Sequence, residues 1–557
     1  MKYLFFLSVL WFSLSSSAQI SQTDETFIDS IMSRQYPADL PGAVILVAKD
    51  GKPVFRKAYG MADIEFQVAN KPDYVFPLAS MSKQFTAVCI LQLVQEGKIS
   101  LKDNIKIYLP DYNDHKRIIT VEQLLTHTSG IPGFDDNTDF TATKDYQRDD
   151  LLNLFMNDTL LFEPGTNFAY TNSGYYLLAL LIEKVSGKSF NAYIDEHIFK
   201  KCGMLHTCIG TNESPIPGLA RGYAATSASA VSTGECFRWS ALMGTGSIVT
   251  SIDDLLRWDQ VLYTDSLVKQ DLLQKAFTSY KTTNGKLCNY GYGWAMGKYQ
   301  HILMLTHRGN QSGYTTAGIR MPSVHTSVFI LSNNSATAPG GIATKIALRL
   351  ANLHLPVPGG YKPSASELKA ERGTYDIDRI GVRIARSHCF ITTSHDSLFI
   401  QEPESEKILL LPLRKHHFMS SRRYGLYYHF ISNLSGQIVS LEVYNLPVNI
   451  GMISERQKLR STTPDDMKLV SLTDEQLKKR CGRFDFGGDA FVTVSMKDSK
   501  LWVQFADQPL VELFPESEFR FIEKNTAVIY EFMADSKGDI NKVIFHGILD
   551  HTGLRVR

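Results

Sequence analysis

Three short runs of the sequence hold residue types that could act together in hydrolysis by a serine nucleophile. The first is Ser80-Met81-Ser82-Lys83, which opens a strongly apolar segment directly after Phe76-Pro77-Leu78-Ala79. A serine at a helix N-terminus feels the positive end of the helix dipole, and a lysine three residues later lies on the same helical face. Partial burial would lower the pKa of Lys83, so that a neutral amine could take the Ser80 proton as general base. The run therefore predicts an acyl-enzyme on Ser80.

A Ser-x-x-Lys pair has little weight alone, because a chain of 557 residues should hold roughly two or three by chance. Three occur, the others being Ser266 to Lys269 and Ser366 to Lys369. A capping serine beside a solvated lysine is the alternative interpretation of the first run. The apolar helix that follows Ser80 is what distinguishes it.

The second run is Tyr170-Thr171-Asn172, the single Tyr-x-Asn of the sequence. In a loop beside Ser80, the Tyr170 oxygen could relay a proton to a leaving group, and the Asn172 amide could bind Lys83 and a substrate carbonyl. A β-turn ahead of a helix over residues 175–185 is the alternative.

The third run is His307-Arg308-Gly309, reached through the apolar residues 302–305. On a strand His307 and Gly309 share one face, and we expect Gly309 to leave room for a substrate backbone. The N–H of Asn310, together with that of Ser80, could form an oxyanion hole. Alone, this run would be an ordinary strand end.

In this order the three runs resemble the motifs of the penicillin-recognising serine hydrolases, a β-lactamase-related group of class C β-lactamases, DD-peptidases, D-aminopeptidases and esterases. The resemblance extends to residues 124–132, 162–165 and 251–255 and covers roughly residues 40–352. It implies an α/β (α+β) catalytic domain, in which helices flank an antiparallel sheet and a helical subdomain carries the Tyr170 loop. Within residues 124–132, His127 is expected to have a structural role, and a functional role is the alternative.

The third motif departs from the Lys-Thr-Gly of many penicillin binders. Histidine, with an ordinary pKa near 6.5, is mostly neutral at pH 7, so His307 should bind a substrate carboxylate less well than lysine would. The histidine form is similar to that of D-aminopeptidases, which also carry two β-barrel modules. We therefore expect a peptidase or amidase of D-aminopeptidase type. A carboxylesterase or a β-lactamase on the same machinery is the alternative, and a non-catalytic β-lactam- or peptide-binding protein is an alternative of another class.

The elements that must position these residues fall into one mixed domain and two β modules. Strand-like runs and helical periodicity alternate from residue 40 to 352, and Asp50-Gly51 predicts a hairpin between residues 43–48 and 54–59. A Pro- and Gly-rich stretch at residues 355–360 predicts a linker.

Four short segments beyond this linker occur twice in the same order. Residues 373–376 recur as residues 482–485, and residues 398–401 recur as residues 501–504. Residues 428–430 recur as residues 530–532, and residues 436–438 recur as residues 538–540. This repetition predicts a duplicated antiparallel barrel or sandwich. The expected limits are 19–355 for the hydrolase domain, 356–368 for a linker, 369–458 for the first module, 459–474 for a second linker and 475–557 for the second module.

Composition and targeting signals limit the partners. Lys plus Arg total 58 against 57 for Asp plus Glu, which gives no reason to expect nucleic acid or an anionic membrane, so a small molecule or peptide is the expected partner. Residues 1–18 have the pattern of a signal peptide, which predicts a periplasmic or secreted protein with no membrane insertion after cleavage.

No metal-site spacing occurs in the sequence, and no cofactor is expected. Seven cysteines are expected mainly as buried thiols, although Cys202 and Cys208 are close enough in sequence to pair.

Overall fold

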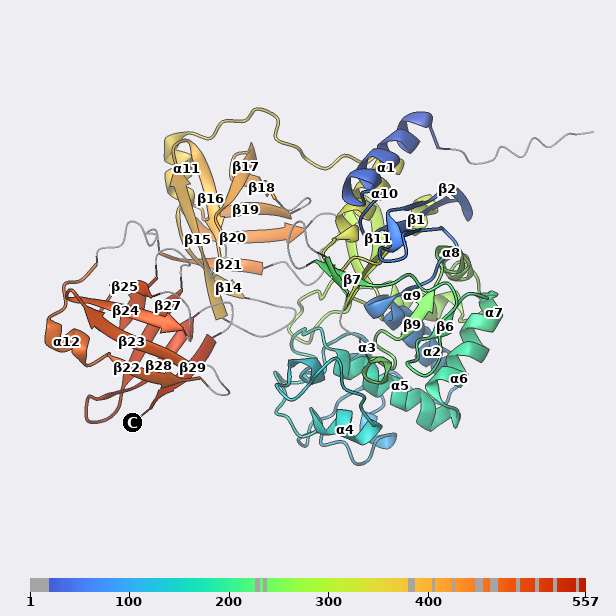
Figure 1. Cartoon of the computed structure of the whole chain (residues 1–557), viewed down its shortest axis with the longest axis horizontal. Helices are drawn as coiled ribbons and strands as arrows, with labels where there is room; N and C mark the ends of the chain where they lie inside the picture. Colours follow the sequence, from blue (N-terminus) through green and yellow to red (C-terminus); the bar gives the residue numbers. More distant parts are fainter. Residues whose placement is uncertain are drawn as a thin grey trace, which may run out of the picture.

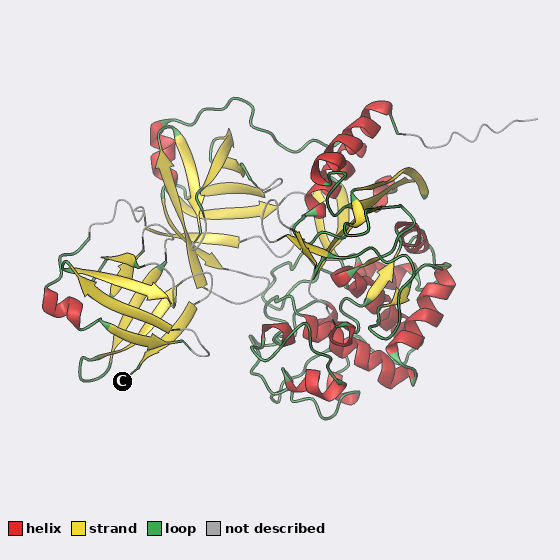
Figure 2. Ribbon diagram, viewed as in Figure 1, coloured by secondary structure: helices red, strands yellow, loops and turns green. Residues whose placement is uncertain are grey.

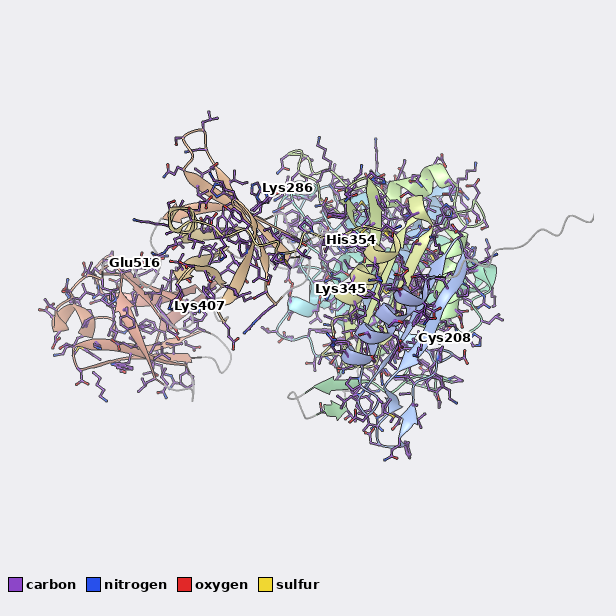
Figure 3. The ribbon with its side chains drawn as sticks, turned by 90° about the horizontal axis from the view of Figure 1, so that it is seen from above. Cys208, Lys286, Lys345, His354, Lys407 and Glu516 are labelled. Carbon is purple, nitrogen blue, oxygen red and sulfur yellow. The ribbon has the colours of Figure 1, made fainter. Side chains whose placement is uncertain are left out.

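The computed structural model describes residues 20–225, 231–233, 238–378, 386–402, 406–422, 426–445, 454–460, 469–486, 491–505, 510–523, 528–546 and 550–556. The signal peptide predicted for residues 1–18 lies outside the described residues. A helix-and-sheet domain is followed by two all-β modules, of which the second lies farther from that domain (Figure 1). Seen from above, Lys407 and Glu516 mark the two modules, well apart from Lys286 and His354 on the first domain (Figure 3).

The first domain is built on a six-stranded antiparallel sheet in the order β10-β11-β12-β13-β1-β2. Its strands are β10 (Ala295–Tyr299), β11 (Ile302–Gln311), β12 (Tyr314–Met321), β13 (Thr326–Ser332), β1 (Ala43–Lys49) and β2 (Lys52–Tyr59). The predicted hairpin is present: Asp50 and Gly51 join β1 to β2 with φ of 51° and 73°. Two successive positive φ angles are typical of the turns that match the twist of a hairpin.

Helices cover both faces of this sheet (Figure 2), so its central strands are buried on both sides. Ile45 and Val47 face α1 (Gln22–Gln35) and α10 (Pro339–Leu350), where Met32 belongs to the same apolar cluster. Val44 and Leu46 face the opposite way and share a cluster with α2 (Lys83–Gln95) and α8 (Ile252–Val261). The alternation follows from the two-residue period of a strand.

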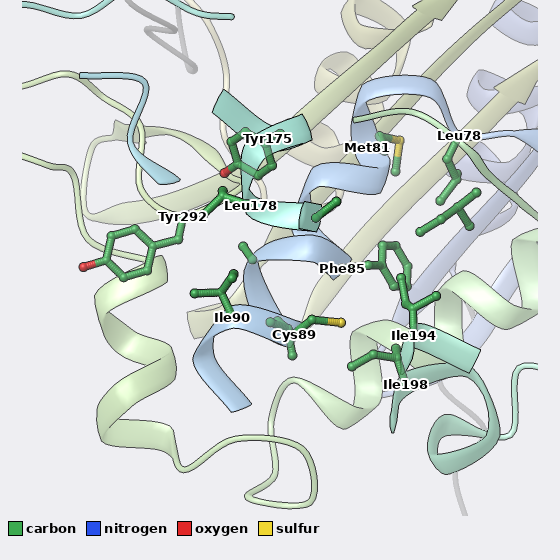
Figure 4. Close-up of a cluster of buried hydrophobic side chains, with 14 of the residues drawn as sticks. Leu78, Met81, Phe85, Cys89, Ile90, Tyr175, Leu178, Ile194, Ile198 and Tyr292 are labelled. Atoms are coloured by element: carbon green, nitrogen blue, oxygen red, sulfur yellow. The ribbon is translucent and has the colours of Figure 1, made fainter. Parts of the chain in front are cut away.

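Helix α2 is the centre of the larger cluster and is buried on nearly every side from Lys83 to Leu93. Figure 4 shows Phe85, Cys89 and Ile90 of α2 among side chains from neighbouring helices. The short 3-10 turn η1 (Ala79–Ser82) precedes it, so Ser80 lies one turn ahead of the α-helix. A helix that is apolar all round needs this enclosure, because none of its faces can be left to solvent.

A helical subdomain lies between residues 105 and 202 of the chain. It comprises η2 (Ile105–Ile107), α3 (Val121–Leu125), η3 (Phe134–Asp136), α4 (Arg148–Asn153), α5 (Asn172–Ser186), α6 (Phe190–Ile194), the turn η4 (Asp195–Phe199) and α7 (Lys200–Cys202). Helix α5 begins behind the cap Thr171, ends at Gly187 with φ of 70° and packs on α2. Helix α9 (Gln270–Ala276) and three small sheets complete the domain. In two of these sheets a pair of strands lies side by side, β3 (Met61–Asp63) with β4 (Val68–Ala69) and β7 (Tyr223–Ala225) with β8 (Val231–Thr233). In the third, β9 (Ile248–Thr250) lies between β5 (Phe76–Pro77) and β6 (Cys208–Ile209).

Each of the two modules is a closed antiparallel barrel. The first contains β14 (Gly373–Asp378), β15 (Arg386–Ser394), β16 (Ser397–Gln401), β17 (Ile408–Arg414), β18 (His417–Ser420), β19 (Leu426–Ser432), β20 (Ile438–Asn445) and β21 (Ser454–Arg460). The second contains β22 (Gly482–Asp485), β23 (Phe491–Lys497), β24 (Lys500–Phe505), β25 (Val511–Pro515), β26 (Arg520–Ile522), β27 (Ile529–Ala534), β28 (Ile540–His546) and β29 (Asp550–Arg555). The predicted architecture, an antiparallel sheet flanked by helices and followed by two barrel modules, is therefore confirmed.

The barrels correspond element by element. The repeated segments noted in the sequence lie on the first, third and sixth strands of each barrel and in the turn after the sixth. A helix with a complete capping box precedes each one, α11 (Ala365–Glu371) and α12 (Asp474–Lys478), and each places a buried leucine, Leu368 or Leu477, in the barrel core. This shared arrangement is what a duplicated module requires.

The first barrel packs on the end of the hydrolase domain. Met419 and Tyr427 belong to the same apolar cluster as Leu353 and Leu355. The Tyr427 hydroxyl donates a hydrogen bond to the Pro356 carbonyl oxygen over 3.1 Å. The beginning of the predicted linker is thus fixed against strand β19 of the first barrel. The residue limits predicted for the domains and linkers stay predictions.

No described cysteine forms a disulfide bond with another described cysteine. Cys89, Cys202, Cys288 and Cys389 are buried and Cys208 and Cys481 are half-buried, while Cys236 lies outside the described residues. In the part of the chain that is described, no helix is both long and apolar enough to cross a bilayer. The same residues contain no group of three or more His, Cys, Asp or Glu that could hold a metal ion.

Candidate active site

Ser80 and Lys83 meet at the start of α2. The Lys83 Nζ lies 3.0 Å from the Ser80 Oγ. Ser80 is half-buried, whereas its neighbours Ala79 and Met81 are buried. The hydroxyl is therefore the part of this turn that a substrate can reach, and the amine lies behind it.

The residue before the nucleophile has an unusual backbone. Ala79 has φ of 47°, which is the left-handed region that residues with a Cβ rarely adopt. The turn is held there by two neighbours: Gly309 of β11 packs against Leu78 and Ala79, and Gly246 approaches Ala79 from another segment. Backbone strain of this kind persists where the surrounding structure holds it, and it is concentrated at functional sites. It fixes the direction in which Ser80 projects.

Lys83 is fully buried and surrounded by oxygens. Besides Ser80, its Nζ contacts the Asn172 Oδ1 at 2.7 Å and the Thr245 carbonyl oxygen at 3.1 Å. Loss of solvent lowers the pKa of Lys83 to about 7, although the negative charge of Asp135 opposes the shift. A neutral amine keeps two donors and gains a lone pair, so it can donate to Asn172 and Thr245 while accepting the Ser80 proton.

Asn172 links Lys83 to a carboxylate that the sequence analysis did not identify. As the first residue of α5, it accepts from Lys83 through Oδ1 and donates through Nδ2 to the Asp135 Oδ2 over 3.0 Å. The amine on one side and the carboxylate on the other fix the orientation of the amide. Asp135 is accessible to solvent, but protein atoms crowd its carboxyl group and the loss of hydration raises its pKa.

Tyr170 lies over the same lysine. The Lys83 Nζ is 5.0 Å from the centre of the Tyr170 ring. Burial raises the pKa of Tyr170, and the neighbouring Ser80 hydroxyl offsets part of that rise. The Tyr170 Oη is buried, and no described residue forms a hydrogen bond with it. The phenol therefore stays protonated and lies beside the Ser80 hydroxyl.

His307 is enclosed, and both of its ring nitrogens are occupied. Nδ1 lies 2.8 Å from the Arg308 carbonyl oxygen, which can only accept, so Nδ1 carries the proton. Nε2 then accepts from the Tyr290 hydroxyl at 3.0 Å. Burial lowers the pKa of His307 to about 3, and the positive charge of Lys83 acts in the same direction. His307 is neutral at physiological pH, and its N–H is directed at the backbone.

Gly309 has a different role from the expected one. A Cβ at this position would collide with the Leu78 carbonyl oxygen and with the Thr316 Oγ1. The space that we expected a substrate backbone to use is filled by the turn that carries Ser80. The glycine is therefore needed to let β11 approach that turn.

Asn310 lies on the exposed part of β11, paired with Thr315 of β12. Strand β10 pairs with β11 only as far as Thr306, so no described strand pairs with residues 307–311 on that side. Unpaired backbone groups at a strand edge can receive an extended peptide. The oxyanion hole expected from the N–H groups of Ser80 and Asn310 remains a prediction.

The fold thus brings the predicted residues together from three separate segments of the chain. Ser80 and Lys83 come from η1 and α2, Tyr170 and Asn172 from the start of α5, and His307 from β11, where its ring centre lies 6.1 Å from that of Tyr170. Sequence reasoning missed Asp135, Thr245 and Tyr290. Asp135 follows the stretch at residues 124–132 by three positions, which was the only signal available for it.

Comparisons with known proteins agree with this arrangement. The family model for beta-lactamase matches residues 31–353, more than half of the chain. Protein flp of Staphylococcus aureus strain MRSA252 is 29% identical over 330 residues, which cover 58% of this chain and 65% of that protein, just under two thirds of its length.

Solved structures share the fold at low sequence identity. An octameric penicillin-binding protein homologue from Pyrococcus abyssi aligns with a TM-score of 0.55 at 21% identity, covering 88% of this chain and 99% of that one. D-amino acid amidase from Ochrobactrum anthropi SV3, solved with D-phenylalanine, aligns with a TM-score of 0.53 at 21% identity, covering 59% of this chain and 99% of that one. Because it covers 88% of this chain, the first of these two alignments extends into the barrel residues.

Proposed function

The chain belongs to the beta-lactamase family, and from that membership we propose that it is a serine hydrolase that forms an acyl-enzyme on Ser80. The observation that carries the proposal is the contact between Ser80 and a buried Lys83 whose pKa lies at about 7. A lysine of this kind is partly neutral at physiological pH and can act as a base. A solvated lysine could not, because it would remain protonated.

The residues have the following roles in the proposed reaction. Lys83 takes the Ser80 proton as Oγ attacks the substrate carbonyl carbon, and the N–H groups of Ser80 and Asn310 stabilise the resulting oxyanion. Tyr170 donates its proton to the leaving group and takes the one held by Lys83, so the leaving group departs neutral. Water then attacks the acyl-enzyme, and its proton returns by the same route.

We propose that the substrate is a small amide or peptide of a D-amino acid with a free amino group. The neutral His307 gives no fixed positive charge for a substrate carboxylate, which disfavours penicillins and C-terminal D-alanine. Asp135 is a solvent-accessible residue joined to Lys83 through the Asn172 amide, and its negative charge is suited to a substrate ammonium group. One solved structure of the same fold is a D-amino acid amidase. Export through the signal peptide of residues 1–18, to the periplasm or the medium, is part of the same proposal.

A substrate panel tests this function. Purified protein is assayed on D-alanine amide, L-alanine amide, N-acetyl-D-alanine amide, D-alanine methyl ester and a chromogenic cephalosporin. We expect highest kcat/KM on D-alanine amide among the amides, and no turnover by Ser80→Ala. Hydrolysis of the ester alone would identify an esterase, and hydrolysis of the cephalosporin alone would identify a β-lactamase.

Asp135→Asn separates recognition of the amino group from the chemistry. We expect this variant to lose about tenfold or more in kcat/KM on D-alanine amide, because a charged hydrogen bond contributes about 1.5–3 kcal/mol. The N-acetyl amide, which has no ammonium group, should be affected much less. Equal losses on both substrates would contradict the role assigned to Asp135.

A further inference from the structure

His127 holds both chain neighbours of Tyr170. Its carbonyl oxygen accepts from the Ala169 N–H over 2.9 Å, and its ring Nδ1 accepts from the Thr171 N–H over 3.2 Å. The His127 ring also lies against Tyr170, with 4.2 Å between ring centres. One residue thus contacts the position before Tyr170, the position after it and its ring.

The backbone at His127 shows that this side chain is unusual at its position. His127 N–H bonds to the Leu124 carbonyl oxygen and Thr128 N–H to that of Gln123, which is the Schellman ending of helix α3. In this motif the residue directly after the helix C-cap adopts the left-handed conformation. His127 occupies that position, with φ of 57°. Glycine is the usual choice there, because it has no Cβ. A buried histidine at a glycine position indicates that its ring is needed.

The bonds also define the protonation state of the ring. Because Nδ1 accepts from a backbone N–H, a neutral His127 carries its proton on Nε2. Nε2 is buried, and no described residue forms a hydrogen bond with it. Burial keeps the pKa of His127 well below its usual value, and the nearby Lys83 and His307 act in the same direction.

Among the described residues, the ring is surrounded by aromatic side chains, and the charged groups that act on its pKa are basic. Aromatic rings enclose it: Phe168, Tyr170, Tyr175 and Tyr290 lie with centres 6.0, 4.2, 5.0 and 4.8 Å away. The basic groups near it are Lys83 and His307. A proton on Nδ1 would break the bond to Thr171 and place a second charge beside Lys83.

We propose that His127 is a positioning residue for Tyr170, which in its neutral Nε2–H form fixes the loop so that the phenol faces Ser80 and Lys83. It does not touch the substrate, and the proposal rests on the proposed role of Tyr170 as proton donor to the leaving group. A residue that only packs the core would affect stability without changing which leaving groups are expelled.

The test compares an amide with an ester. An amide needs its leaving nitrogen protonated, whereas an alkoxide leaves more easily, so displacing Tyr170 should slow amide turnover more. His127→Gly removes the ring and suits the left-handed backbone. We expect its kcat on D-alanine amide to fall about 100-fold, within the range of general acid catalysis. On D-alanine methyl ester the fall should be about tenfold or less, with KM nearly unchanged for both.

Two variants serve as comparisons. His127→Asn keeps an acceptor near the Nδ1 position and tolerates positive φ, so it should recover part of the lost amide activity. His325→Gly is the matched control, because His325 also has a positive φ of 44° and its ring also stacks on a tyrosine, Tyr263, at 4.9 Å. It should leave the ratio of amide to ester turnover unchanged.

The outcomes separate this proposal from the proposed function. If Ser80→Ala retains full activity, the proposed function fails. If Ser80→Ala is inactive but His127→Gly lowers amide and ester turnover equally, or changes only the melting temperature, the positioning role is overturned. Should His127→Gly not fold, nitrogen NMR of the histidine-labelled wild type still decides: we expect Nε2 protonated and Nδ1 unprotonated between pH 5 and 8, and a His127 that titrates in this range contradicts the proposal.

Discussion

The Lys83 Nζ contacts the Ser80 Oγ at 3.0 Å from a position with no exposure to solvent. The same enclosure that brings the two atoms together removes the hydration that would keep the lysine charged. The closeness of Lys83 to Ser80 and the basicity of the Lys83 amine therefore have one cause, which is the burial of the first turn of α2.

The pH dependence of kcat/KM should report Lys83. Because the base must be neutral, activity should rise with pH through about 7, the pKa of Lys83. Asp135 raises that pKa through its negative charge, so Asp135→Asn should move the acid limb to lower pH. His307, with its pKa at about 3, should contribute no ionisation above pH 5. The shift is measured from pH profiles of kcat/KM on an N-acetylated amide, whose binding does not depend on Asp135. An acid limb that stays in place or moves to higher pH in Asp135→Asn contradicts the role of Lys83 as base.

Lys83 should also destabilise the folded protein in a pH-dependent way. Its folded pKa of about 7 lies below the ordinary value of 10.5, so the unfolded chain binds the proton more tightly. The destabilisation is complete below pH 7 and is lost as pH rises toward 10.5. Lys83→Met should therefore stabilise the hydrolase domain, by roughly 2 to 3 kcal/mol more at pH 6 than at pH 9. Urea unfolding at both pH values tests this, and a pH-independent difference would show that Lys83 is not desolvated.

Gly309→Ala should damage the site through the backbone. Its methyl group would collide with Leu78 and push the turn that carries Ser80 away from β11. We expect a loss of about 1–3 kcal/mol in stability, as for other overpacked cores, and at least a tenfold loss in kcat. Gly341→Ala is the control, because a Cβ there meets nothing within 4 Å in helix α10 and should be neutral or slightly stabilising. Wild-type activity in Gly309→Ala would disprove the packing argument.

Tyr290→Phe should loosen His307. The Tyr290 hydroxyl is the donor to Nε2, and removing it leaves a buried acceptor unpaired at a cost of about 1–3 kcal/mol. The pKa of His307 stays low, because burial is its main cause. We therefore expect reduced stability and kcat without a new ionisation in the pH profile. A new ionisation near pH 6 would mean that Tyr290, rather than burial, keeps His307 neutral.

Much of the fold could be predicted because its signals are local or repeated. Asp50-Gly51 marks a hairpin by its own conformational preference, and the recurrence of residues 428–430 as 530–532 marks the sixth strand of each barrel. The helix after Ser80 is visible in a continuous apolar run. The hairpin and helix signals depend on residues that are neighbours in sequence, and the barrel signal depends on the similarity of two segments of the chain.

The unpredicted parts of the site depend on contacts between distant segments. Asp135, Thr245 and Tyr290 reach Asn172, Lys83 and His307 through the tertiary fold, and none of them stands in a recognisable motif. The positive φ of Ala79 has no signal in its residue type. The prediction that Gly309 leaves room for a substrate backbone was wrong, because the sequence does not show that Leu78 occupies the space beside this glycine.

Trapping of the acyl-enzyme tests the central claim most directly. The protein is mixed with D-alanine methyl ester, quenched over a time course and analysed by intact-protein and peptide mass spectrometry. We predict an alanyl adduct on the peptide containing Ser80 that forms and disappears with turnover, and its absence in Ser80→Ala. Turnover with no adduct on Ser80, or an adduct that persists in Ser80→Ala, would contradict the account.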